Sequence, residues 1–144
     1  MISFLVHIAP AQFPALLAEL ATREFNGDPP TMTREWVQEY RTELSFRDIP
    51  VEWLKPAIPL YRHVLDRATE ESWLGHPVRV ASAEGLILLK LLAYRPQDVA
   101  DIENLVAAHR ETLDLAWIQS EWATVAAMDD PRMGRVEELV GGRG

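Results

Sequence analysis

The stretch VRVASAEGLILLKLLAYRPQDVADI, residues 78–102, decides the fold of the second half of the chain. Its first three residues have the β-branched character of a short strand. Ser82 follows as a residue type that caps helices, and residues 86–94 are apolar on every side except at Lys90. A helix that is apolar all round belongs in a core. We therefore expect a strand followed by a buried helix that carries one cation.

Lys90 needs a partner, because an unpaired ammonium group inside an apolar helix is costly. Asp98 and Asp101 follow on the next helix, three residues apart and hence on one face, after the corner formed by Arg95 and Pro96. We predict that these aspartates fold back toward Lys90. Spacing alone leaves two interpretations open: a structural ion pair that fixes the angle between the helices, or a functional site.

The remainder of the second half also reads as helical. Pro96 begins one helix, and Asp114 and Asp130 are predicted to cap two more, the last ending at Gly141 and Gly142. Residues 141–144 are expected to form a frayed end.

The first half mixes strands and helices. We predict a largely buried strand over residues 2–8, a helix from Pro10 to Arg23 and a turn over residues 26–30. Residues 34–40 fit either a short helix or a strand. Residues 42–46 alternate as a strand that ends at residues 48–50, with Glu43 on the face opposite Leu44.

An irregular helix over residues 56–69 and a turn over residues 75–77 complete the predicted order. Strands gathered early and helices late favour an α+β fold, with a small mixed sheet backed by helices and a helical C-terminal half. We expect a single domain over residues 1–144, with the strands in residues 1–81 and helices in residues 82–140.

Composition narrows the function classes. The chain has 144 residues, 14 basic and 22 acidic, and a formal net charge of −8. It contains no cysteine, which excludes disulfides and thiolate metal sites. No run of basic residues is available to neutralise phosphates, so broad nucleic-acid binding is disfavoured. No apolar run approaches the roughly 20 residues of a membrane helix, and no signal peptide is recognisable, so we expect a cytoplasmic protein without a membrane segment.

Six residues within the stretch 78–102 carry a family resemblance: Ser82, Glu84, Lys90, Arg95, Asp98 and Asp101. Their order resembles the C-terminal half of nucleotidyltransferase-fold proteins related to the AbiEii and MenT type toxins. In that family a strand is followed by Ser-x-Glu, an apolar helix with a lysine, and Arg-x-x-Asp-x-x-Asp. The segment around residues 41–46 resembles the strand that bears the family's third acidic position, which falls on Glu43.

The resemblance implies a nucleotidyltransferase-like fold and Mg²⁺-dependent nucleotidyl transfer from a nucleoside triphosphate. It assigns Lys90, Asp98 and Asp101 to the catalytic machinery, with the lysine near the triphosphate and the aspartates orienting it. It places Ser82 and Arg95 among the nucleotide-binding residues and Glu43 among the metal ligands.

The sequence departs from this family where its metal ions bind. It has no Gly-Ser pair and no Asp-x-Asp on a strand, and Glu43 alone cannot hold two Mg²⁺ ions. We therefore expect a truncated or degenerate relative that binds Mg²⁺ only if the missing carboxylates are supplied. The alternative is a non-catalytic interaction module on the same fold, which forms a homodimer or binds a toxin–antitoxin partner through a sheet edge or tryptophan-rich segments.

Histidines and tryptophans are the remaining candidates. The four histidines lack the short spacing of a metal site, so no ligand role is predicted for His7, His63, His76 or His109. Trp117 and Trp122 are expected to pack in the helical half. Core packing and a partner-binding patch are both open for the other three tryptophans: Trp36, Trp53 and Trp73.

Overall fold

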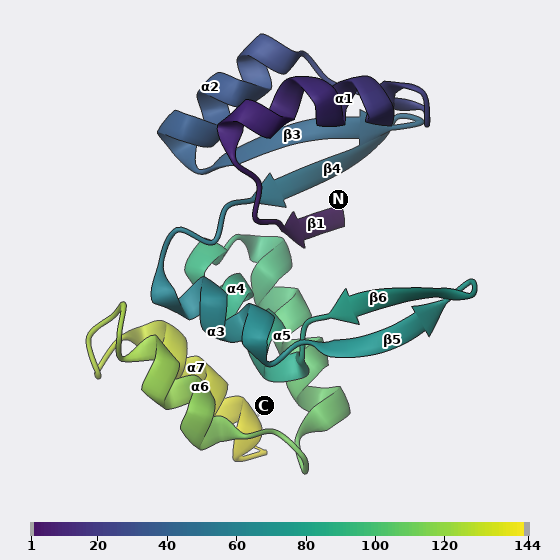
Figure 1. The fold of residues 1–144 in the computed structure, drawn as a ribbon. Helices are drawn as coiled ribbons and strands as arrows, with labels where there is room; N and C mark the ends of the chain where they lie inside the picture. Colours follow the sequence, from purple (N-terminus) through teal and green to yellow (C-terminus); the bar gives the residue numbers. More distant parts are fainter. Residues whose placement is uncertain (1, 143–144) are drawn as a thin grey trace. The chain divides into compact units, whose positions relative to one another are not determined.

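The computed structural model describes residues 2–142 (Figure 1). The chain divides into two compact units, Met1–Pro59 and Leu60–Gly144, and each is described by itself. The fold is α+β, as the sequence predicts: a mixed four-stranded sheet with helices packed on it, a separate hairpin and a helical C-terminal half. The single domain expected over residues 1–144 stays a prediction.

The first unit is a sheet covered by two helices. Its elements in chain order are β1 (Ile2–Leu5), the 3-10 turn η1 (Pro10–Gln12), α1 (Phe13–Ala21), β2 (Phe25–Asn26), α2 (Pro29–Glu39), β3 (Arg41–Phe46) and β4 (Ile49–Leu54). The strand order is β1-β4-β3-β2, with β1 parallel to β4 and the other pairs antiparallel. Helices α1 and α2 lie on the same face of the sheet (Figure 1).

Aromatic packing holds the helices on the sheet. The ring of Phe13 on α1 lies 5.6 Å from that of Trp36 on α2 and 6.1 Å from that of Trp53 on β4. Trp36 also donates a hydrogen bond from Nε1 to the carbonyl oxygen of Ile8, at 3.1 Å. Because Trp36 and Trp53 are both buried, core packing is their role and the partner-binding patch is excluded for them.

The second unit is mainly helical. It contains α3 (Pro59–Asp66, beginning at the unit boundary), β5 (Thr69–Trp73), β6 (His76–Val80), α4 (Ala83–Ala93), α5 (Pro96–His109), α6 (Leu115–Trp122) and α7 (Pro131–Val140). Helix α4 packs against α5 and α6, and α7 packs against the same two helices. Ile87, Leu88 and Leu91 of α4 are fully buried, which confirms that this helix belongs in a core.

Strands β5 and β6 form a separate two-stranded sheet that extends away from the helices of its unit (Figure 1). Leu74 and Gly75 make the two-residue turn, both with positive φ, +52° and +79°. This is the backbone geometry of a tight hairpin turn that matches the twist of the strands. Trp73 is therefore at the tip of the hairpin, where it is 68% exposed.

Several sequence predictions are confirmed. Ser82 caps α4, where its Oγ accepts a hydrogen bond from the Gly85 N–H at 3.0 Å. Asp114 and Asp130 cap α6 and α7 in the same way, and Pro96 begins α5. Of the predicted frayed end, residues 143–144 lie outside the described residues.

Other boundaries differ from the predictions. The strand predicted over residues 2–8 ends at Leu5, and it is not largely buried, since Ile2 and Phe4 are about half exposed. The strand predicted to end at residues 48–50 instead turns at Arg47 and Asp48, both with positive φ, and continues into β4. The predicted turn over residues 75–77 lies one residue earlier, and His76 begins β6. Residues 34–39 are helical, but the helix begins at Pro29, is capped by Asp28 and ends before Tyr40, which is left-handed. The irregular helix predicted over residues 56–69 is the regular and shorter α3, which begins at Pro59 and ends at Asp66.

Candidate functional site

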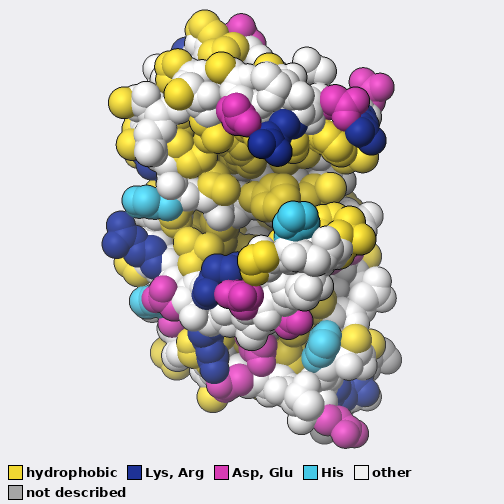
Figure 2. Space-filling model, turned by 45° about the vertical axis from the view of Figure 1, so that its right-hand side comes forward, with side chains coloured by type: hydrophobic (Ala, Val, Ile, Leu, Met, Phe, Trp, Pro, Cys, Tyr) yellow, Lys and Arg dark blue, Asp and Glu magenta, His cyan; other side chains and the backbone are white. Residues whose placement is uncertain are grey.

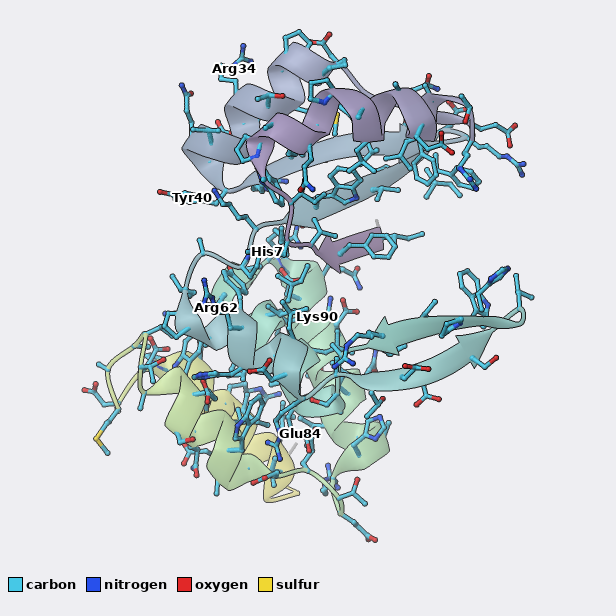
Figure 3. The ribbon with its side chains drawn as sticks, in the orientation of Figure 1. His7, Arg34, Tyr40, Arg62, Glu84 and Lys90 are labelled. Atoms are coloured by element: carbon cyan, nitrogen blue, oxygen red, sulfur yellow. The ribbon has the colours of Figure 1, made fainter. Side chains whose placement is uncertain are left out.

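The candidate site lies at the corner between α4 and α5 and is built around Lys90. The α4 backbone ends at Ala93, and Tyr94 takes up a left-handed conformation with φ +47° that stops the helix. Arg95 is extended and Pro96 starts α5. Since Lys90 is in the last turn of α4, its side chain lies beside the first turns of α5, and it is 28% exposed (Figure 3).

Asp101 is the closest partner of Lys90. Its Oδ2 lies 2.7 Å from the Lys90 Nζ, and its other oxygen, Oδ1, accepts a hydrogen bond from Gln97 at 2.9 Å. The hydrogen bonds from Lys90 and Gln97 lower the pKa of Asp101 below its ordinary value, because they stabilise the charged form. The carboxylate is 30% exposed and so keeps contact with solvent.

Asp98 is the buried member of the cluster, with 2% of its side chain exposed. Its Oδ2 accepts two hydrogen bonds from Arg95, from the backbone N–H at 2.9 Å and from Nε at 2.8 Å. Its Oδ1 lies 3.7 Å from the Lys90 Nζ. Burial alone would raise the pKa of Asp98, but the hydrogen bonds and charge of Arg95, with the charge of Lys90, lower it overall.

The prediction that both aspartates fold back toward Lys90 is thus met in the geometry of the corner. The four side chains Lys90, Arg95, Asp98 and Asp101 form one connected network of two cations and two anions. Each carboxylate already has a cationic partner. The network can hold the two helices at a fixed angle, and it can also present an oriented ammonium group at a partly exposed corner.

Ser82 lies apart from this network. It caps the opposite end of α4, eight residues before Lys90, which corresponds to about 12 Å along a helix. Its hydroxyl oxygen is occupied by the Gly85 N–H. Glu84 is also near that end, where its Oε1 accepts a hydrogen bond from the backbone N–H of Asp114 at 3.1 Å. Both residues therefore have structural partners in the second unit.

Glu43 is in the first unit, exposed on β3 and directly opposite Glu52 on β4. Glu52 is buried, accepts a hydrogen bond from the Arg41 Nε at 3.0 Å, and lies 3.4 Å from the Ser3 Oγ. Like charges directly opposite each other on neighbouring strands destabilise a sheet, so Arg41 compensates this pair. Within residues 2–142, no group of three or more His, Asp or Glu side chains is arranged to hold a metal ion.

The sequence analysis missed Glu52. An acid between Val51 and Trp53, in a run that is otherwise apolar, was the available signal, because a carboxylate is rarely buried without a partner. It was overlooked because the strand was predicted to end at Pro50.

The histidines are dispersed in the structure as well as in the sequence. His63 on α3 pairs with Glu121 on α6, with 2.8 Å between Nδ1 and Oε2. This contact links two helices of the second unit. His7 and His76 are exposed and no metal-holding group in the described part of the chain includes them.

On the face of the described residues drawn in Figure 2, Lys and Arg side chains lie among Asp and Glu side chains. No helix within residues 2–142 is long and apolar enough to span a bilayer.

Comparison with known proteins leaves the family open. No family model matches the chain, and no curated protein matches it either. The likeness to nucleotidyltransferase-fold toxins therefore rests on the residues of the α4–α5 corner and on the α+β fold alone.

Proposed function

We propose that the chain is a nucleotidyltransferase-like protein in which the α4–α5 corner is the triphosphate-facing part of the fold. The observation that carries the proposal is the 2.7 Å contact between the Lys90 Nζ and the Asp101 Oδ2, made across the corner by the residues on which the family resemblance rests. The ancestral reaction would be Mg²⁺-dependent transfer of a nucleotidyl group. Within residues 2–142, no group of carboxylates is arranged to hold Mg²⁺, so this reaction would need further carboxylate ligands.

Each residue of the corner would then have a role toward an anion. Lys90 is partly exposed, and Asp101 orients its ammonium group from the α5 side. A phosphate oxygen can approach Lys90 from the solvent side, as a second acceptor for one of its three N–H groups. Asp98, held by Arg95, keeps the corner rigid and reduces the reorganisation that binding would need.

The test is a titration of the isotopically labelled chain with ATP, followed by the NMR signals of its backbone amides. We expect signals of residues 90–101 to shift, equally with Mg²⁺ and with a chelator. Lys90→Met should abolish these shifts. The chain offers a matched control in its only other lysine, Lys55→Met, which should leave them unchanged.

Two results would count against the proposal. One is the absence of any shift at the corner at saturating ATP. The other is an unchanged response in Lys90→Met. Tight binding that requires Mg²⁺ would instead show that the chain assembles a metal site that the described carboxylates do not form.

A second candidate function is a protein-interaction module, and the β5–β6 hairpin favours it. Trp73 and Leu74 at the hairpin tip are 68% and 82% exposed, and large apolar side chains exposed together are typical of interaction sites. The edge strand β1 also exposes Ile2 and Phe4 and has no strand paired on its outer side among the described residues.

This candidate is tested by co-expression with the protein encoded beside it. If the chain is a toxin–antitoxin partner, the two proteins should co-purify, and the double substitution Trp73→Ser with Leu74→Ser should abolish the complex. Met128→Ser is the control, since Met128 is 92% exposed but lies outside the hairpin. Co-purification that survives the tip substitutions would reject the hairpin as the binding element.

A further inference from the structure

We infer that the β5–β6 hairpin tip of one copy of the chain docks into a proline-lined groove on the first unit of a second copy. The inference rests on the interaction-module function and names its partner. It follows from two surfaces of the same chain that match each other in apolar character and in charge.

The groove lies between α1 and α2. Pro14 comes from α1, and Pro29, Pro30 and Val37 come from α2. Its volume is about 480 Å³. Because proline has no backbone N–H to present, this surface is mainly apolar and suits an apolar side chain. Val37, at 51% exposure, has no apolar cover within the described residues.

Arg34 adds a positive charge at the groove. It is exposed, points away from α2 (Figure 3), and forms no ion pair with any residue in the range 2–142. The guanidinium group therefore remains available for an acidic partner. An occupant of this groove should carry a large apolar side chain with a carboxylate nearby.

The hairpin tip has this combination. Trp73 and Glu71 are two residues apart on β5 and so lie on the same face of the hairpin. Neither Glu70 nor Glu71 forms an ion pair with another described residue. Arg79 on β6 does not neutralise them, because it donates hydrogen bonds to the carbonyl oxygens of Leu65 and Ala68 at the base of the hairpin. The acidic, apolar tip complements the basic, apolar groove.

The buried surface area favours two reciprocal contacts in one dimer. A buried tryptophan contributes about 150–250 Å², whereas a specific interface needs about 1,000 Å² in total. The area buried by one tip in one groove is smaller than this, even when Leu74 and the groove surface are added. Two equivalent contacts related by a two-fold axis reach the lower end of the range, so the expected product is a weak, concentration-dependent homodimer.

Sedimentation velocity over a concentration series tests this directly. The wild-type chain should shift from monomer to dimer, and Trp73→Ser should weaken the dimer by about tenfold or more, as expected for an aromatic anchor. Arg34→Glu should also weaken it, and adding Glu71→Arg to that variant should restore it. Met128→Ser should leave association unchanged.

Cross-linking identifies the two surfaces, and the absence of native cysteine makes the reading unambiguous. A chain carrying Ser72→Cys is mixed with a chain carrying Gln38→Cys and treated with a short bis-maleimide. A mixed dimer should form, whereas Met128→Cys in place of Ser72→Cys should give none.

Three results overturn the inference: a wild-type chain that stays monomeric, a dimer that is indifferent to Trp73 and Arg34, or a mixture of the Ser72→Cys and Gln38→Cys chains that gives no mixed cross-linked dimer. A monomeric wild-type chain whose heterologous complex still depends on Trp73 would reject self-docking while leaving the interaction module intact. None of these outcomes depends on ATP binding at Lys90.

Discussion

The Nζ of Lys90 lies 2.7 Å from the Oδ2 of Asp101, eleven residues away on the next helix. The contact crosses the corner where α4 stops and α5 begins, so it joins two helices that also share apolar packing. Asp101 has a second donor in Gln97 and is 30% exposed. Neither partner therefore depends entirely on the other.

Replacing Lys90 by Met should cost less than about 1 kcal/mol of unfolding free energy, which is the value for a partly exposed ion pair. Asp101 keeps Gln97 and solvent, and the buried Asp98 keeps its three hydrogen bonds from Arg95. Urea denaturation monitored by circular dichroism measures the change. A loss of 3 kcal/mol or so would mean that a carboxylate is left buried and uncompensated.

Asp98→Ala should be more damaging, by about 1–3 kcal/mol. The substitution removes a buried carboxylate that receives the Arg95 backbone N–H at the start of α5 and also lies near Lys90. The same denaturation experiment applies. Asp129→Ala is the control, because Asp129 is exposed and is not a helix cap; its stability should stay within about 0.5 kcal/mol of wild type.

Acid should destabilise the chain partly through this corner. The folded-state pKa values of Asp98 and Asp101 lie below the ordinary value of an aspartate, because hydrogen bonds from Arg95, Lys90 and Gln97 stabilise the charged carboxylates. A lowered pKa stabilises the fold above the unfolded-state pKa, and this contribution is lost as the pH falls through the folded-state pKa. Unfolding free energy should therefore decline below about pH 4.

The variant Asp98→Asn checks the origin of that decline. It should be less stable than wild type at neutral pH and lose less stability on acidification, because one of the titrating groups is gone. Parallel pH profiles for the two proteins would show that Asp98 has the same pKa in the folded and unfolded chain.

Two glycines should respond in opposite directions to alanine. A Cβ at Gly27 would clash with the sulfur of the buried Met32 and lie 3.3 Å from the Leu44 Cβ, so Gly27→Ala should destabilise the first unit by about 1–3 kcal/mol. Gly134 is inside α7 and a Cβ there meets nothing within 4 Å. Gly134→Ala should stabilise the chain by about 0.5–1 kcal/mol.

Melting temperatures measured side by side test this pair. Equal shifts, or a stabilised Gly27→Ala variant, would contradict the tight packing between the β2–α2 loop and the sheet.

Local signals made the helical half predictable. Ser82, Asp114, Asp130 and Pro96 each set a helix start by chemistry within a few residues, and each start is where the sequence indicates. The corner could be predicted for the same reason, because an unpaired ammonium group in an apolar helix is costly and a nearby carboxylate offsets that cost.

The sheet was harder because its determinants are not local. Pro50 indicates a strand end, yet it belongs to β4, where it pairs with Ser45 of β3. A proline is tolerated there because, among the described residues, β1 pairs with β4 from Val51 onward. Strand β5 is exposed throughout and has no alternation to detect. Only the tertiary pairing identifies these segments.

The pairing of β1 with β4 has a consequence for how the chain folds. Ser3 and Glu52 are 49 residues apart, whereas β3 and β4 are joined by a two-residue turn. Loop closure makes distant pairings slower to form, so the β3–β4 ribbon should assemble first and the N-terminal strand should dock onto it last. Pulse-labelled hydrogen exchange during refolding should show amides of residues 41–54 protected before those of residues 2–5. During synthesis, β1 should therefore stay unpaired until β4 has left the ribosome.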